Sequence, residues 1–297
     1  MFQSPRFCHY PGVEPKSKAG RFLFRIARLL LVGLLILYAG ACVLVFSFQR
    51  KLLYPGRVRS AEHVSGLARE ARLERWTNSV GQPIGMKRLS PNQPSAGSVL
   101  IIYGNGGSAT GCAHYVDTIQ KCAAFDVFIV EYPGYADRPG APNQSSLLAA
   151  AREAFQLLPT NQPIFLVGES LGTGIASYLA GEFPEKISGV MLLSPYARLA
   201  DVAQYQYPWL PARWLLLDDF RSEEYLQSYH GSVGVMLDGQ DVVVPERFGR
   251  RLFEKYSGPK QLWEFPYLGH IQIGEGPEIF WNEVIQFWHA EKSKVSG

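Results

Sequence analysis

The stretch from Ile164 to Gly174, which reads IFLVGESLGTG, constrains the fold of this chain more than any other part. A short apolar run after Pro163 is typical of a strand buried in a parallel sheet, and the pattern G-x-S-x-G follows it directly. Gly168 and Gly172 permit a turn so tight that a Cβ at either position would clash. The pattern therefore predicts a nucleophile elbow that exposes Ser170 between a strand and a helix. A Gly-rich turn that only connects the two elements is the alternative.

Around this stretch, segments with strand and helix patterns alternate along the chain. Strand-like runs lie at residues 99–103, 127–131, 164–167, 189–193, 233–237 and 261–265, and helical ones at 110–123, 144–157, after 170 and at 277–288. This spacing predicts βαβ units, and hence a mostly parallel sheet with helices on both faces. Two more strand-like stretches, 73–77 and 84–89, are separated by a Gly-Gln-Pro turn as in a hairpin. Ligands of such sheets bind outside the carboxyl ends of the strands.

Candidate catalytic side chains follow three of these strands. Ser170 comes after one, Asp241 after the strand at 233–237, and His270 after the last strand. A serine hydroxyl needs a base such as histidine to take its proton, and a carboxylate that orients the imidazole completes the set. Asp238 is the rival acid, but its place at the very end of its strand suits a turn residue better, so we predict Asp241.

The first strand of the alternating region ends in a glycine-dense loop, Tyr103-Gly104-Asn105-Gly106-Gly107. Backbone N–H groups in such a loop can approach a bound oxygen without obstruction by side chains. We predict an oxyanion hole formed by the amides of Asn105 and Leu171. A phosphate-cradling turn is the alternative, although no G-K-[ST] or complete G-x-G-x-x-G follows.

The N-terminal region reads as a membrane anchor. Residues 1–28 form a basic tail, and residues 29–48 contain no charge over a length that spans about 30 Å as a helix. Basic residues flank this stretch on both sides, which argues against a core helix, and its length argues against a cleaved signal peptide. We predict an uncleaved signal anchor that crosses the membrane once. A juxtamembrane connector, residues 49–70, follows it, and the heavier N-terminal basic cluster favours placing the rest of the chain on the non-cytoplasmic side.

Composition excludes several other classes of function. The chain of 297 residues is 47% hydrophobic, enough for one sizeable core, and its net charge of +3 is spread without a basic stripe. We therefore expect no nucleic-acid partner. The four cysteines show neither C-x-x-C spacing nor histidines at zinc-like intervals, so no metal site is expected. No cofactor is expected either. The sequence indicates no oligomeric state.

Taken together, the anchor, the connector FQRKLLYP, YGNGG, EYPGY, GESLG, DGQDVVVP and the Gly-His pair before Ile271 resemble the α/β-hydrolase superfamily. The resemblance is to its single-pass, membrane-anchored serine hydrolases of the alpha/beta-hydrolase-domain (ABHD) type, and it covers residues 45–290. It implies an α/β-hydrolase domain over residues 71–290 with a short lid. The implied activity is hydrolysis of an acyl ester or thioester through a Ser170-His270-Asp241 triad and an acyl-enzyme intermediate. Peptidase or amidase action, or an inactive scaffold, remain alternatives. Tyr103 departs from the histidine that is common in relatives.

The predicted lid, residues 195–218, leaves the sheet just before the acid strand and is rich in aromatic and aliphatic residues. An insertion this apolar, close to a membrane anchor, would line an acyl pocket or touch lipid. We therefore predict a lipid-like acyl substrate that is bound in part by Trp209 and Trp214. The alternative is that these aromatic residues belong to the core of a short helix.

Overall fold

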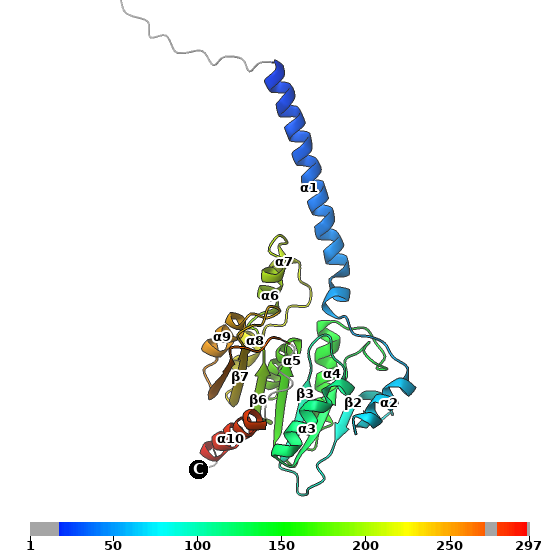
Figure 1. The fold of residues 1–297 in the computed structure, drawn as a ribbon, viewed down its shortest axis with the longest axis vertical. Helices are drawn as coiled ribbons and strands as arrows, with labels where there is room; N and C mark the ends of the chain where they lie inside the picture. Colours follow the sequence, from blue (N-terminus) through cyan, green and yellow to red (C-terminus); the bar gives the residue numbers. More distant parts are fainter. Residues whose placement is uncertain (1–17, 271–277, 296–297) are drawn as a thin grey trace, which may run out of the picture. The chain divides into compact units, whose positions relative to one another are not determined.

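The computed structural model describes residues 18–270 and 278–295, and it contains one large sheet (Figure 1). Within the described residues the sheet has eight strands in the order β1-β2-β4-β3-β5-β6-β7-β8. Their bounds are β1 Glu74–Thr77, β2 Pro83–Arg88, β3 Gly97–Ile102, β4 Phe125–Val130, β5 Ile164–Glu169, β6 Ile187–Leu193, β7 Ser232–Asp238 and β8 Lys260–Phe265.

The sheet is parallel from β4 to β8 and antiparallel at one edge. β4, β3, β5, β6, β7 and β8 pair in parallel, whereas β1 pairs with β2 and β2 with β4 in the antiparallel direction. Every residue of β3, β4 and β7 is buried, as expected for strands that are covered on both faces. The prediction of a mostly parallel sheet with a preceding hairpin is therefore confirmed.

Helices cover both faces of the sheet (Figure 1). On one face α3 (Ala113–Cys122) packs against α10 (Glu278–Val295), and on the other α5 (Leu171–Glu182) packs against α4 (Gln144–Gln156) and α8 (Ser222–Tyr225). The strand at the centre of this arrangement, β5, leads directly into α5. A capping box in which the Asn143 and Ser146 side chains each bond to the other residue's backbone amide sets the start of α4. Two further helices of the domain are α2 (Ala61–Glu70) and α9 (Glu246–Lys255), and short 3₁₀ turns lie at Ala109–Cys112 and Leu226–Ser228.

The predicted lid contains two short helices, α6 (Leu199–Gln206) and α7 (Ala212–Leu215). Asp219 fixes the start of α6, because its Oδ1 accepts a hydrogen bond from the amide of Ala200 at 2.9 Å and its Oδ2 pairs with Arg198. Asp201 in α6 pairs with Arg213 of α7 and with Arg251 of α9. The lid segment is thus an ordered part of the domain that is tied to its neighbours by charged pairs.

The N-terminal helix α1 runs from Lys18 to Leu53, beyond the predicted span of 29–48 at both ends. Among the described residues, Arg21–Leu53 is the one helix long and apolar enough to cross a membrane by length and composition. Contacts divide the chain into two compact units, Met1–Ser47 and Phe48–Gly297, so the last turns of α1 belong to the larger unit. The first 17 residues of the predicted basic tail lie outside the described residues, and the predicted domain boundaries stay predictions.

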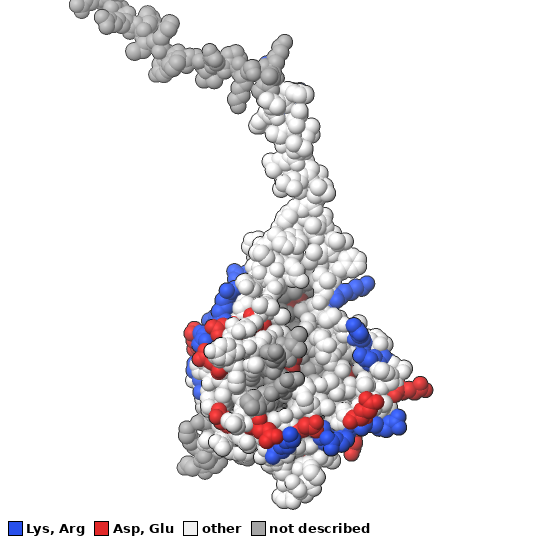
Figure 2. Space-filling model, viewed as in Figure 1, with Lys and Arg blue, Asp and Glu red and all other residues white. Residues whose placement is uncertain are grey.

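Charged side chains are distributed unevenly over the visible face of the molecule. In Figure 2, blue and red residues lie interspersed on the larger unit, and most of the length of the α1 helix is white. This agrees with the absence of any charged residue from Leu29 to Phe48. The mixed surface of the larger unit is typical of a soluble domain.

Candidate active site

Ser170 lies at the turn between β5 and α5 with a backbone conformation that non-glycine residues rarely adopt, φ 49° and ψ −115°. Its amide donates to the Leu193 carbonyl at 2.9 Å, and its carbonyl accepts from the Thr173 hydroxyl at 2.6 Å. A Cβ on Gly172 would lie 2.0 Å from the Ile102 carbonyl oxygen, so only glycine lets α5 approach β3 here. The geometry is that of a nucleophile elbow, in which the surrounding structure holds a strained serine.

Three side chains from distant parts of the chain form a hydrogen-bonded series. The Oγ of Ser170 lies 2.9 Å from Nε2 of His270, and Nδ1 of His270 lies 2.6 Å from Oδ2 of Asp241. Asp241 is buried, and its other oxygen accepts from the amides of Val243 and Val244 at 2.8 and 2.7 Å. Because these two amides fix the carboxylate, the imidazole is oriented with Nε2 toward the serine. The three residues come together as the sequence pattern predicts.

Asp238, the rival acid, has a different partner. Its Oδ2 accepts a hydrogen bond from the Ser194 hydroxyl at 2.7 Å, and its Oδ1 is buried and has no partner among the described residues. Burial raises the pKa of the Asp238 carboxyl to about 6, helped by the charge of Asp241. Asp241, not Asp238, therefore pairs with His270 in this structure.

The glycine-dense loop after β3 lies against the elbow. A Cβ on Gly104 would lie 3.4 Å from the Cβ of Ser170 and 3.0 Å from Oε1 of Glu169. Leu171 is the first residue of α5, so its amide has no acceptor within the helix, and neither it nor the Asn105 amide donates to another described residue. Both amides are thus available to a bound oxygen.

The loop is held by a buried cluster that the sequence did not predict. The hydroxyl of Tyr103 bonds to Glu131, the hydroxyl of Tyr132 donates to the Tyr103 carbonyl at 2.5 Å, and that of Tyr135 donates to the Asn105 carbonyl at 2.9 Å. Glu131 also accepts from the Ala109 amide at 3.1 Å, and burial raises its pKa to about 7. Tyr103 therefore braces the loop through Glu131. The EYPGY motif, residues 131–135, was the available signal.

The two tryptophans of the lid are largely exposed in this structure. The exposed fraction is 55% for Trp209 and 88% for Trp214. Tyr205, Tyr207 and Leu217 of the same segment are also exposed. The predicted substrate-binding role of the tryptophans stays a prediction.

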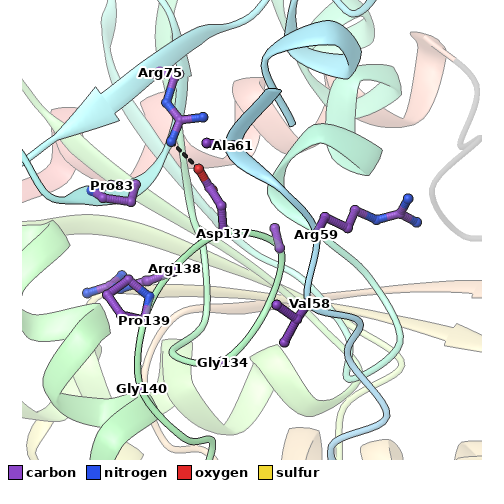
Figure 3. A pocket seen from close by; sticks show the side chains of 11 residues that line it. Val58, Arg59, Ala61, Arg75, Pro83, Gly134, Asp137, Arg138, Pro139 and Gly140 are labelled. Atoms are coloured by element: carbon purple, nitrogen blue, oxygen red, sulfur yellow. Dashed lines mark hydrogen bonds and ion pairs between the residues drawn. The ribbon is translucent and has the colours of Figure 1, made fainter. Parts of the chain in front are cut away.

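A hollow of about 550 Å³, which contains no triad residue in its lining, is lined by parts of the connector, of β1 and β2 and of residues 134–140 (Figure 3). Its arginines already have partners. Arg75 pairs with Asp137, and Arg138 donates to Glu153 at 2.7 Å and to the Glu131 carbonyl at 2.7 Å. In Figure 3 the Arg59 side chain points away from the hollow. Among residues 18–270 and 278–295, no group of three or more His, Cys, Asp or Glu side chains is placed to hold a metal ion.

Comparison with known proteins identifies relatives over most of the chain. An uncharacterized protein of Mycobacterium tuberculosis, Rv2307c, is 33% identical over 258 residues, which cover 84% of this chain and 90% of that protein. An uncharacterized membrane protein of Saccharomyces cerevisiae, YNL320W, is 27% identical over 84% of this chain and 92% of its own length. Lysophosphatidylserine lipase ABHD12 of Danio rerio is 25% identical over 57% of this chain and 50% of its own length.

Solved structures show the same fold. The ferulic-acid-bound structure of Est1E from Butyrivibrio proteoclasticus superposes with a TM-score of 0.61 at 15% identity, covering 73% of this chain and all of Est1E. The sequence profile of the alpha/beta hydrolase fold family matches residues 97–265, from the start of β3 to the end of β8. With the sheet order, the elbow and these matches in view, the chain belongs to the α/β-hydrolase superfamily.

Proposed function

We propose that this protein is a membrane-anchored serine hydrolase that cleaves an acyl ester or thioester, with Ser170, His270 and Asp241 as its catalytic residues. The observation that carries the proposal is the hydrogen-bonded series from Ser170 Oγ through His270 to Asp241, with distances of 2.9 and 2.6 Å. A relative that is named a lipase, ABHD12, supports hydrolase activity.

In the first half of the reaction, the Oγ of Ser170 attacks the acyl carbonyl carbon while Nε2 of His270 takes the hydroxyl proton. Asp241 holds the proton on Nδ1 and stabilises the imidazolium that forms. The carbonyl electron pair moves onto its oxygen, where the amides of Asn105 and Leu171 donate hydrogen bonds. Collapse of this tetrahedral intermediate expels the alcohol or thiol, which receives its proton from Nε2, and leaves an acyl-enzyme.

In the second half, water replaces the departed group. His270 takes a proton from the water, whose oxygen attacks the acyl carbon, and the same two amides stabilise the second oxyanion. Collapse returns the proton to Ser170 Oγ and releases the acid. Each cycle is redox-neutral: the serine proton leaves with the alcohol or thiol, and a proton from the attacking water restores the Ser170 hydroxyl.

Two observations support a lipid-like acyl substrate. The helix Arg21–Leu53 has the length and composition to cross a membrane, and a protein held at a bilayer meets amphiphilic acyl chains at high local concentration. The lid adds exposed apolar side chains, Trp209 and Trp214 among them, and its Gln206 bonds to the acid loop. ABHD12, one of the relatives, is named a lysophosphatidylserine lipase. The sequence bias toward N-terminal basic residues supports a non-cytoplasmic hydrolase domain.

The decisive experiment is labelling with a fluorophosphonate, which reacts covalently with an activated serine. Full-length protein should be labelled at Ser170. Ser170→Ala should abolish the label and lower the turnover of a short activated ester at least about 1,000-fold. Circular dichroism of the variant checks that the fold is intact. If the folded wild-type protein takes no label and hydrolyses no ester, the inactive scaffold is the better description.

A further inference from the structure

The segment that follows the apolar stretch of α1 forms side-chain hydrogen bonds both with the lid and with the loop that carries Asn105. We infer that residues 49–54, called the strap below, position both the lid and the proposed oxyanion loop, so that Arg50, Tyr54, Asp218 and Asn105 are positioning residues for the hydrolysis. This inference rests on the proposed function. All strap contacts lie within the unit Phe48–Gly297.

The strap holds the carboxyl end of the lid. Arg50 binds Asp218 with two parallel hydrogen bonds, Nε to Oδ2 at 3.0 Å and an Nη to Oδ1 at 3.1 Å, and the Tyr54 hydroxyl donates to Oδ2 at 3.1 Å. The side chain of Asp218 is only 4% exposed, so a carboxylate here depends on these donors. Burial and the Asp218 charge raise the pKa of the Tyr54 phenol, which therefore stays a neutral donor.

A second set of contacts joins the strap to the backbone of the lid. The side-chain amide of Gln49 donates to the Leu215 carbonyl at 3.0 Å, and its oxygen accepts from the Leu217 amide at 2.8 Å. Gln49 is nearly buried. Because this side chain bonds to the backbone on both sides of Leu216, it fixes the position of the chain there and not only a side-chain rotamer.

The strap also contacts the loop that carries the proposed oxyanion amide. The side-chain amide of Asn105 donates to the Leu53 carbonyl at 2.9 Å, while the Asn105 carbonyl accepts from Tyr135. Leu53 is the last residue of α1, so no N–H group of the helix donates to its carbonyl. These two bonds hold Asn105 through its side chain and its carbonyl, and its backbone amide donates to no other described residue.

The lid also contacts the loop that carries Asp241. Gln206, at the end of α6, donates to the carbonyls of Val242 and Val243 at 2.6 and 2.7 Å. Both residues follow Asp241, whose Oδ1 accepts from the Val243 amide. The acid loop, the lid, the strap and the oxyanion loop are therefore joined in this order by direct hydrogen bonds, and the strap is the link between the lid and the oxyanion loop.

This arrangement predicts two different kinetic effects. Loosening the lid changes how an acyl chain is bound, so Arg50→Gln and Asp218→Asn should raise KM for long-chain nitrophenyl esters about tenfold and flatten the dependence on chain length. Freeing the oxyanion loop weakens an interaction made only in the transition state, so Asn105→Ala should lower kcat about ten- to hundredfold with little change in KM.

The test measures kcat and KM of full-length variants in vesicles, with active sites counted by fluorophosphonate labelling. Arg57→Gln is the matched control, because it removes the same charge from an exposed arginine whose side chain forms no hydrogen bond or ion pair with another described residue. Arg50→Lys keeps the charge but loses the two-bond geometry, so it should fall between wild type and Arg50→Gln. The double variant Arg50→Gln/Asp218→Asn should lose less than the two single losses combined, because no buried carboxylate is left unpaired.

The outcomes separate this inference from the function on which it rests. If wild type is labelled and active but Arg50→Gln, Asp218→Asn and Asn105→Ala match Arg57→Gln in kcat, KM and chain-length profile, the strap has no positioning role, even where their melting temperatures fall. If wild type takes no label, the proposed function fails first, and the role of the strap in catalysis fails with it.

Discussion

At the scale of single residues, two neighbouring aspartates have divided roles. Asp241 is fixed by two backbone amides and faces His270, whereas Asp238 is held by Ser194 and keeps one oxygen without a partner among the described residues. The sequence placed both carboxyls three positions apart after one strand. The place of Asp238 at the end of its strand favoured Asp241, and the hydrogen bonds show that Asp241 is the carboxylate that pairs with the imidazole.

This division predicts a difference between two conservative substitutions. Asp241→Asn should lower kcat/KM for an ester about 10,000-fold, because an amide in its place favours the wrong imidazole tautomer. Asp238→Asn should retain at least about a tenth of the activity, because the Ser194 bond can still form. Steady-state kinetics of both variants make the comparison, and a reversed order would show that the wrong carboxylate has been assigned.

Asp238 also predicts how stability depends on pH. Its pKa is raised from 3.8 to about 6 in the folded protein, so the neutral carboxyl is favoured, and its contribution to stability is full below 3.8 and lost as the pH rises through about 6. The loss is at most about 3 kcal/mol. Asp238→Asn carries no such charge, so its melting temperature relative to wild type should rise between pH 4 and pH 7. A constant difference over this range, measured by scanning calorimetry, would contradict the assignment.

At the scale of elements, the composition of the lid predicted an acyl pocket that the contacts of the lid do not show. Its aromatic residues suggested an acyl pocket, yet Trp209 and Trp214 are 55% and 88% exposed, while α6 and α7 are held by pairs such as Asp201 with Arg213. An apolar side chain that remains exposed on an ordered element is available to a substrate or a lipid surface. The lid therefore remains the element that we expect to set chain-length preference.

We expect kcat/KM in a nitrophenyl ester series to rise beyond acetate, with each additional buried methylene contributing roughly 0.8 kcal/mol until the site is full. Trp209→Ala or Trp214→Ala should flatten this rise. Val80→Ala is the control, since Val80 is equally apolar, 76% exposed and lies in the turn between β1 and β2. A wild-type preference for acetate would mean that the lid encloses a small polar pocket instead.

At the scale of the whole molecule, the chain joins a long apolar helix to a hydrolase domain. We expect carbonate washing to leave the full-length protein in the membrane pellet, because Arg21–Leu53 has the hydropathy of a spanning helix. Removal of residues 1–47 should release a soluble domain that still hydrolyses esters, since the strap remains. The small residues Ala39-Gly40-Ala41 resemble a signal-peptidase site, so a mature N-terminus near Cys42, detected by Edman degradation or mass spectrometry, would instead indicate a processed signal.

The sequence predicted the parts of this molecule that depend on local patterns. The alternation of strands, the glycines around Ser170 and the order of Ser170, Asp241 and His270 are visible because each follows from a few adjacent residues and from parallel-sheet topology. The contact of Arg50 with Asp218 joins residues 168 positions apart, and Glu131 and Tyr103 meet because they follow the two neighbouring strands β4 and β3. No periodicity marks such pairs, so they emerge only from the folded chain.

The course of α1 has a consequence for exchanging parts between relatives. The helix looks like a single interchangeable piece that ends at Leu53, but the contact boundary lies between Ser47 and Phe48. A chimera that joins a foreign anchor after Leu53 would replace Gln49 and Arg50 by the residues of the other protein and lose their contacts with the lid. A junction before Phe48 would keep the native strap. Recombination among homologues should therefore tolerate crossovers upstream of Phe48 and select against those in the last two turns of the helix.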